Sequence, residues 1–398
     1  MIYAFRGADP FNLFNKINQY KYKTFILGQN YRSTKTIVNA SQSLIRYNDR
    51  PDEKTLFTDN EKGEKILYFN PVNQAEEASR ICQIIESGVK SGQMMYSDVA
   101  ILYRNSFLSR NMEDALMRSK IPYNIVSGTN FYTRKEIKDI ISFLDFFMNP
   151  RNLLSLNRII NIPKSGIGEK TTDMIIKNAC EISQNYAILK LTEMISILEE
   201  VSLSSAKLKE KMAPFISRCK EINEYMKEVS YSPSNLIQKI INVFEYQKYL
   251  NDYDEDTYEE RMMNVGELQS VANTYDDIYE FLENVHSFYD NEGSEGDDEV
   301  SENRVRLMTM HASKGLEFRV VFIIDANSGI VPSWRCESER DIQEERRLFY
   351  VGMTRAKENL VIMSPKKMMK RGGLVESSPS MFIGQIASEY IHTAKNAS

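Results

Sequence analysis

The chain has 398 residues, 42% of them hydrophobic and 26% charged, which is typical of a folded protein with two or three domains. A formal net charge of −5 argues at first against a nucleic-acid-binding protein. The four cysteines form no CxxC pair, and no apolar run approaches the ~18 residues of a membrane span. Zinc-site, disulfide-rich and membrane proteins are therefore disfavoured, and we expect a cytoplasmic protein with no membrane partner and no metal ligands of its own.

Residues 1–149 alternate β-rich runs with a helical pattern. The runs at 24–27, 65–69 and 98–103 are rich in the residue types that favour strands. After the first run, Ser33 can cap a helix whose apolar positions recur with helical spacing, at Ile37, Ala40, Leu44 and Ile45. Strands and helices that alternate in this way predict βαβ units and a parallel sheet.

Two segments of this region could contact a nucleotide or a nucleic acid. Residues 30–34 (NYRST) stand where a strand is expected to end and a helix to begin, and ligands of open α/β sheets bind at that edge. Arg32 could pair there with phosphate oxygens, although a surface arginine beside a capping serine fits the pattern too. Residues 3–7 (YAFRG) interleave aromatic rings with a cation, which suits base stacking but also the end of a half-buried strand.

From about 150 to 300 the strand signals fade, and stretches such as 187–212 and 235–249 predict helices. The sequence GIG at 166–168 stands between helical stretches. A Gly-x-Gly turn can hold a DNA phosphate with its backbone N–H groups, or it can simply connect two helices. Residues 287–303 hold seven acidic residues and no basic residue, so we expect a mobile acidic loop.

Strand signals resume after residue 300, in the runs 305–310, 320–324 and 360–363. The simplest arrangement is one α/β domain made of residues 1–149 and 301–398. An all-helical domain, residues 150–300, is then inserted between its two parts.

Two further motifs lie among the later strands. The octet 311–318 (HASKGLEF) connects two strands, and its Ser-Lys-Gly resembles a phosphate loop read backwards. Glu317 in this octet could accept hydrogen bonds from ribose hydroxyls. Residues 344–356 (EERRLFYVGMTRA) begin as a charged helix and bring Arg355 to the edge of the sheet. Each motif alone would fit an ordinary connection or a solvated helix face.

One motif is absent. None of the 17 glycines is followed by lysine, so G-x-x-x-x-G-K-[ST] does not occur. The nearest candidate for a magnesium-binding strand end, 320–325, lacks a second acidic residue. We therefore expect that this chain cannot bind and hydrolyse a nucleoside triphosphate by itself.

In this order, the motifs closely resemble the second half of a UvrD/Rep/PcrA-type superfamily 1 DNA helicase, over essentially all 398 residues. Six collinear segments carry the resemblance: 2–9, 29–34, 136–139, 166–168, 307–318 and 344–356. The resemblance implies a RecA-like parallel-sheet domain of the P-loop NTPase type, without its own P-loop, and an inserted all-α domain. It also implies an ATP-dependent 3′–5′ DNA helicase of the bacterial cytoplasm, active in DNA repair or replication.

The resemblance assigns five residues to ATP. Tyr31 would stack on the adenine, and Glu317 would hold the ribose. Arg32 and Arg355 would reach the γ-phosphate from across a cleft as the catalytic arginines. Gly315 would belong to the same ATP-binding set, while Mg²⁺ would be held by the other half of the helicase.

The resemblance also assigns contacts with DNA. Single-stranded DNA would contact the early aromatic segment and one later histidine, that is, Tyr3, Phe5, Arg6 and His311. At the junction of single and double strands, the duplex would be held by the glycine turn of the helical domain, that is, by Lys164, Gly166 and Gly168.

The chain departs from the family in two respects. The first half, with its phosphate loop and Mg²⁺-binding acids, is not part of the sequence, so we expect the chain to partner an N-terminal RecA-like half. Residues 366–373 (KKMMKRGG) are basic and lack the aromatic expected near a strand-separating hairpin. A standalone nucleic-acid-binding module is the alternative, whereas a helicase–nuclease subunit is disfavoured because a clustered Asp/Glu pattern is lacking. Without the seven acidic residues of 287–303 the net charge would be +2.

Overall fold

The computed structural model describes residues 27–49, 56–126, 130–184, 186, 188–228, 231–293, 303–370 and 373–394. The chain divides into two compact units, which are described separately. The sheet unit comprises Met1–Asn130, Asp298–Met368 and Leu374–Ser398. The helical unit comprises Phe131–Asp297 and Met369–Gly373.

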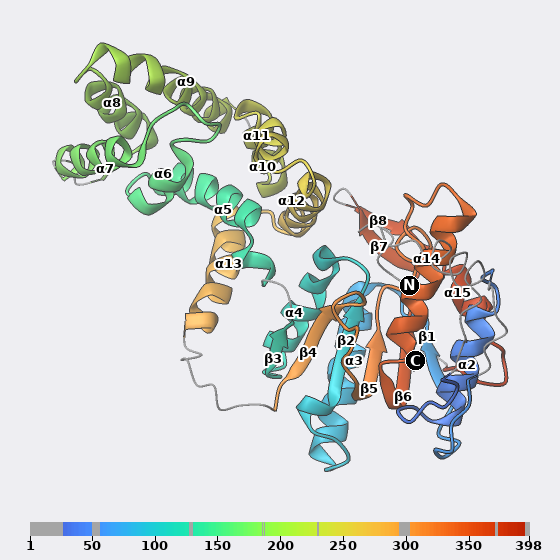
Figure 1. The fold of residues 1–398 in the computed structure, drawn as a ribbon. Coiled ribbons are helices and arrows are strands. Elements are labelled where there is room, and N and C mark those ends of the chain that lie inside the picture. The colour runs from blue at the N-terminus through green and yellow to red at the C-terminus, as the bar shows by residue number, and fades with distance from the viewer. Residues whose placement is uncertain are drawn as a thin grey trace. The chain divides into compact units, whose positions relative to one another are not determined.

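Among its described residues, the sheet unit contains a sheet of seven parallel strands in the order β3-β4-β2-β5-β6-β1-β9. They are β1 (Ile66–Phe69), β2 (Val99–Tyr103), β3 (Tyr123–Ile125), β4 (Val305–Thr309), β5 (Phe318–Ile323), β6 (Ala356–Met363) and β9 (Ile391–Thr393). Figure 1 labels all of these strands except β9. In the centre, Phe322 of β5 is in register with Ile101 of β2 and with Val361 of β6. Strands from both ends of the sequence thus form one sheet, which confirms the predicted α/β fold.

The five runs expected as strands at 65–69, 98–103, 305–310, 320–324 and 360–363 are confirmed as β1, β2, β4, β5 and β6. The expected strand at 24–27 falls mostly outside the described residues. Its last residue, Leu27, is not in a strand and is 82% exposed.

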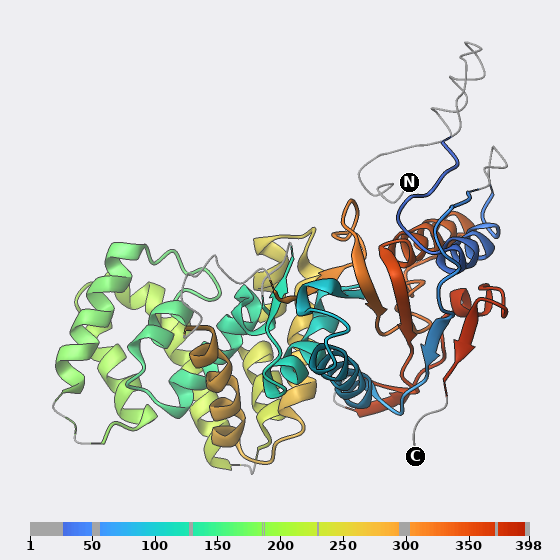
Figure 2. The same cartoon turned by 90° about the horizontal axis from the view of Figure 1, so that it is seen from below.

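Successive side chains of the strands enter two separate cores, as the two-residue period of a strand requires. Ala100 and Leu102 of β2 pack in the core that also holds α2 (Lys35–Ile45) and α14 (Glu339–Met353). Val99 and Ile101 pack in the opposite core. That core also holds α3 (Gln74–Lys90) and α4 (Ser109–Arg118). Helices therefore cover both faces of the sheet (Figure 2). Short helices η2 (Tyr96–Asp98), η3 (Ser106–Leu108) and α15 (Met381–Gly384) complete the unit.

The predicted cap of α2 is wrong. Thr34 precedes the helix, and its side chain makes no capping hydrogen bond. The hydroxyl of Ser33 instead donates to the carbonyl of Ala356, 2.6 Å away, at the start of β6. Ser33 therefore fixes the segment before α2 to the sheet.

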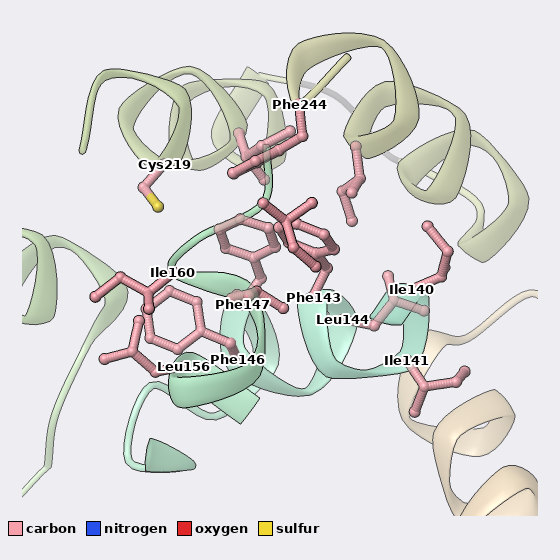
Figure 3. Close-up of a cluster of buried hydrophobic side chains, with 14 of the residues drawn as sticks. Ile140, Ile141, Phe143, Leu144, Phe146, Phe147, Leu156, Ile160, Cys219 and Phe244 are labelled. Atoms are coloured by element: carbon pink, nitrogen blue, oxygen red, sulfur yellow. The ribbon is translucent and has the colours of Figure 1, made fainter. Parts of the chain in front are cut away.

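The helical unit contains one 3₁₀ turn and nine α-helices among its described residues. They are η4 (Phe131–Thr133), α5 (Lys135–Met148), α6 (Leu153–Ile159), α7 (Glu169–Ser183), α8 (Leu191–Ser202), α9 (Ala206–Glu228), α10 (Pro233–Val243), α11 (Tyr246–Tyr253), α12 (Tyr258–Ala272) and α13 (Ile278–Gly293). Phe143, Phe147 and Phe244 meet in its core, with ring centroids 4.4–6.4 Å apart (Figure 3). The core is mainly aromatic and aliphatic, so the unit has a hydrophobic interior of its own.

The helical unit differs from its expected outline in three places. It begins at Phe131 rather than at residue 150, because the apolar face of α5 packs into its core. The stretches 187–212 and 235–249, expected as helical, are each divided between two helices, the first between α8 and α9 and the second between α10 and α11. Residues 287–293 of the expected acidic loop belong to α13, and residues 294–302 lie outside the described residues.

Residues 366–373 include the first strand of a separate two-stranded sheet and the start of its second strand. β7 (Lys367–Lys370) pairs with β8 (Gly373–Glu376). The exposed side chains of β8 include Leu374 and Val375, which are 54% and 46% exposed.

Candidate nucleotide-facing and DNA-facing sites

The side chain of Asn30 shapes the segment that carries Arg32. Its Oδ1 accepts hydrogen bonds from the backbone N–H groups of Arg32 and Ser33, each at 2.9 Å. The N–H of Thr34 then donates to the carbonyl of Lys357 at 3.0 Å. An Asx turn and a contact with β6 therefore hold Arg32 in place before α2 begins.

Arg32 and Glu317 form an ion pair although 285 residues separate them in the sequence. Arg32 Nε lies 2.8 Å from Glu317 Oε2, and Arg32 Nη1 donates to the carbonyl of Thr354 at 3.0 Å. Lys357 Nζ lies 2.8 Å from the other carboxylate oxygen of Glu317. Hydrogen bonds from Lys357 and Arg32 lower the pKa of Glu317 to about 2, so this carboxylate is charged at neutral pH.

Arg355 lies beside this ion pair and is only 9% exposed. Its guanidinium donates to the carbonyls of Val351 and Leu316 at 2.9 and 3.0 Å, and to the hydroxyl of Thr354 at 3.2 Å. Burial and the nearby charge of Arg32 lower the pKa of Arg355 to about 10, so it stays protonated at neutral pH. Three cations and one carboxylate therefore meet here, and we call Arg32, Glu317, Arg355 and Lys357 the arginine cluster.

The arginine cluster lies at the amino-terminal edge of the sheet. Glu317 directly precedes β5, and Arg355 directly precedes β6, which is parallel to it. Sequence reasoning associated residues 30–34 with the carboxyl ends of strands, whereas the described contacts of Arg32 are with residues that precede β5 and β6. A phosphate loop of this sheet would lie at its carboxyl-terminal edge. The arginine cluster, at the amino-terminal edge, therefore suits a phosphate group held by another domain.

Two further residues expected at the nucleotide lie near the arginine cluster in sequence. Tyr31 is 79% exposed, and its hydroxyl donates to Gln29 Oε1 at 2.7 Å, so its ring is open to a stacking partner. Gly315 has φ of +91°, a conformation that side chains rarely adopt, so the turn before Glu317 requires glycine.

His311 lies at the opposite, carboxyl-terminal edge of the sheet, just after β4. Arg104, which follows β2, lies close enough to affect its charge. The guanidinium of Arg104 binds Glu345 of α14 with both ends of its fork, at 2.8–3.0 Å. Sequence reasoning missed Arg104 and Glu345 because 241 residues separate them.

The lowered pKa of His311 leads to a testable prediction about how stability depends on pH. Burial, and secondarily Arg104, lower its pKa to about 4, so the folded protein holds a neutral imidazole at pH 7. The unfolded chain binds this proton more tightly, so stability should fall as pH decreases from about 6.5 towards 4. When the pH is lowered from 7 to 5, the free energy of unfolding in urea should fall less for His311→Gln than for the wild type. An equal loss in both proteins would contradict the assignment.

The glycine turn of the helical unit joins α6 to α7, as the sequence predicted. Gly166 has φ of +73°, and its carbonyl accepts a hydrogen bond from Lys211 of α9. Asn161 holds the turn from within, since its Nδ2 donates to the carbonyl of Ile167 at 3.1 Å and its Oδ1 accepts from the N–H of Ser165 at 2.8 Å. Gly168 precedes the first turn of α7, and Lys164 is exposed. Sequence reasoning missed Asn161 and Lys211.

Three residues expected at single-stranded DNA, Tyr3, Phe5 and Arg6, lie outside the described residues. Within the part of the chain that the structure describes, no group of three or more His, Cys, Asp and Glu side chains could hold a metal ion. None of the helices searched in that same part is long and apolar enough to cross a membrane.

Comparison with known proteins identifies the family. The family model of the UvrD-like helicase C-terminal domain matches residues 25–367. The chain belongs to this family. It is 34% identical to the ATP-dependent DNA helicase PcrA of Staphylococcus epidermidis over 99% of the chain and 54% of that helicase. The PcrA helicase of Leuconostoc citreum is 32% identical, over 99% of the chain and 53% of the helicase.

The UvrD-like chain thus spans about half the length of these helicases. Its structure was also matched with a crystal structure of the C-terminal domain of a possible DNA helicase from Lactobacillus plantarum WCFS1. The match covers 92% of this chain and 99% of the other, at 9% identity and a TM-score of 0.34. The family assignment rests on the sequence matches alone.

Proposed function

We propose that this UvrD-like chain is the second motor half of an ATP-dependent 3′–5′ DNA helicase. It would act with an N-terminal RecA-like half that carries the phosphate loop and the Mg²⁺ ligands. Arg32 and Arg355 would stabilise the γ-phosphate, Glu317 would hold the ribose, and Tyr31 would stack on the adenine. His311 and the segment of Tyr3, Phe5 and Arg6 would contact single-stranded DNA, and Lys164, Gly166 and Gly168 would contact duplex.

The observation that carries this proposal is the surplus positive charge of the arginine cluster. The guanidinium groups of Arg32 and Arg355 lie close together. Because their like charges repel, the charge of Arg32 lowers the pKa of Arg355. Glu317 is the acidic member of the cluster, so a multiply charged anion would balance the remaining cations. A triphosphate has the charge and size required, and charge stabilisation is the main requirement of phosphoryl transfer.

The cluster also suggests how the nucleotide would enter. Both carboxylate oxygens of Glu317 are engaged, one by Arg32 and one by Lys357. Arg32 would exchange Glu317 for the phosphate, and Glu317 would then accept the ribose hydroxyls while Lys357 keeps it charged. Closure of the cleft around ATP and its opening after hydrolysis would move the chain along a single DNA strand.

The simplest experiment uses the purified 398-residue chain. We expect no DNA-stimulated ATP hydrolysis, because the sequence lacks the phosphate loop, but measurable binding to a single-stranded oligonucleotide that weakens steeply with salt. A phosphate-release assay and a salt titration of binding measure the two properties. ATP hydrolysis by the chain alone would contradict the proposal that the phosphate loop lies in the other half. Binding that does not depend on salt would contradict contacts with DNA phosphates.

The same assays separate the proposal from a nucleic-acid-binding module without ATPase activity. When the chain is joined to a phosphate-loop-bearing half, a helicase should hydrolyse ATP in response to DNA. A module would bind DNA equally well whether or not that half is present, and no hydrolysis would follow.

A further inference from the structure

Trp334, the only tryptophan of the chain, lies on the surface in a loop of the sheet unit. The loop follows β5, and the Trp334 side chain is 68% exposed. The N–H of Trp334 donates to the carbonyl of Gly329 at 3.0 Å, and the N–H of Cys336 donates to the carbonyl of Ser333 at 3.1 Å. Val331 within the loop is fully buried and anchors it to the core. Backbone hydrogen bonds and the buried Val331 therefore hold the loop that exposes the ring.

Two features distinguish this ring from an ordinary exposed hydrophobic side chain. The guanidinium carbon of Arg335 lies 5.4 Å from the centroid of the Trp334 ring, so a cation and an aromatic face are presented together. The loop is also linked to the edge that carries His311. The N–H of Ser333 donates to Glu345 Oε2 at 3.3 Å, and Glu345 binds Arg104.

We propose that Trp334, with Arg335, is a base-stacking site for single-stranded DNA beside His311. This inference rests on the proposed function, which places the single strand at this edge, and it adds a contact that the motifs did not predict. An unpaired base has a flat face that can stack on an indole ring, and the phosphate next to it suits a guanidinium. Bases within a duplex are already stacked, so the site should prefer single strands.

Because Trp334 is the only tryptophan, its fluorescence reports on this site alone in the 398-residue chain. Titration with an oligothymidylate should quench its emission, with the same midpoint as binding measured by anisotropy of a labelled oligonucleotide. A blunt duplex of equal length should quench it much less. Trp334→Ala should weaken single-strand binding roughly tenfold, whereas Trp334→Phe, which keeps an aromatic face, should retain most of the affinity.

Phe57→Ala provides the matched control, because Phe57 is also an exposed aromatic residue, at 53%, of the sheet unit. Its affinity for the oligonucleotide should equal that of the wild type. If the chain binds the oligonucleotide but its emission is unchanged and Trp334→Ala binds normally, the stacking site is wrong and the proposed function stands. If the wild-type chain binds no single-stranded DNA, the proposed function fails, and the stacking site fails with it.

Discussion

Arg32→Ala should lower the DNA-stimulated kcat for ATP by about 10³-fold or more in the protein that joins this chain to a phosphate-loop-bearing half. An arginine supplied across a domain interface contributes on the order of 10³–10⁵ in rate to phosphoryl transfer. Arg32 is suited to this role because the Asn30 turn fixes its backbone, while its side chain bonds Glu317 and one carbonyl among the residues that the structure describes. Affinity for single-stranded DNA should remain within a few-fold of the wild type.

Arg319→Ala is the matched control for Arg32→Ala. Arg319 lies in β5, two residues after Glu317, and pairs with Glu358 at 2.7 Å. It is an ion-paired arginine outside the arginine cluster, so its replacement should leave kcat nearly unchanged. Equal kcat values for Arg32→Ala and Arg319→Ala would remove the catalytic role of Arg32.

Arg355 is better tested by a conservative substitution, because its side chain also makes hydrogen bonds within the sheet unit. Its guanidinium satisfies the carbonyls of Val351 and Leu316, and Arg355→Ala would leave both without this donor. Arg355→Lys keeps a charge at the site but cannot reproduce the fork of donors. It should lower kcat by at least tenfold, while unfolding in urea shows whether the sheet unit stays stable.

Asp139→Ala should destabilise the helical unit by about 3–5 kcal/mol. Asp139 is 1% exposed and accepts bonds from Lys135 Nζ, Arg158 Nε and the hydroxyl of Tyr246, at 2.7, 2.7 and 2.9 Å. Burial lowers the pKa of Lys135, but Asp139 outweighs that effect and leaves this pKa above its ordinary value. Removal of the carboxylate leaves two cations and a buried hydroxyl without their shared partner.

Urea unfolding of the chain, followed by circular dichroism, measures this loss. Glu199→Ala provides the control, because Glu199 pairs with Lys220 at 2.6 Å but both side chains are about half exposed. Exposed pairs contribute about 0–1 kcal/mol, so the control should unfold almost as the wild type does. Similar unfolding midpoints for the two variants would show that the Asp139 network does not hold the helical unit together.

Local patterns in the sequence were sufficient to predict much of the fold. The β-rich runs predicted β2, β4, β5 and β6, because buried parallel strands are almost continuously apolar. The absence of strand signals predicted a helical insertion. The sequence did not show that α5 belongs to that insertion, because an apolar helix face does not reveal which core it enters.

Contacts between distant residues explain what the sequence could not show. The motif at 136–139 was recognised by resemblance, but its role in joining helices became clear only from Asp139 and its partners. Lys357 was not singled out at all, because nothing in a local pattern links it to Glu317. Arg32, Glu317 and Arg355 were predicted as one site only through the family, since 323 residues separate the first from the last.

If Arg32 acts on the phosphate during its transfer, it should contribute most to the binding of a transition-state analogue. The measurement compares the dissociation constants of ADP and of ADP with aluminium fluoride, for wild-type and Arg32→Ala forms of the joined protein. A residue that acts in the transition state should affect the analogue far more than the ground-state ligand. We predict that Arg32→Ala weakens ADP–aluminium fluoride by at least 100-fold and ADP by less than about threefold. Equal losses for the two ligands, or none for either, would show that Arg32 does not act in the transition state.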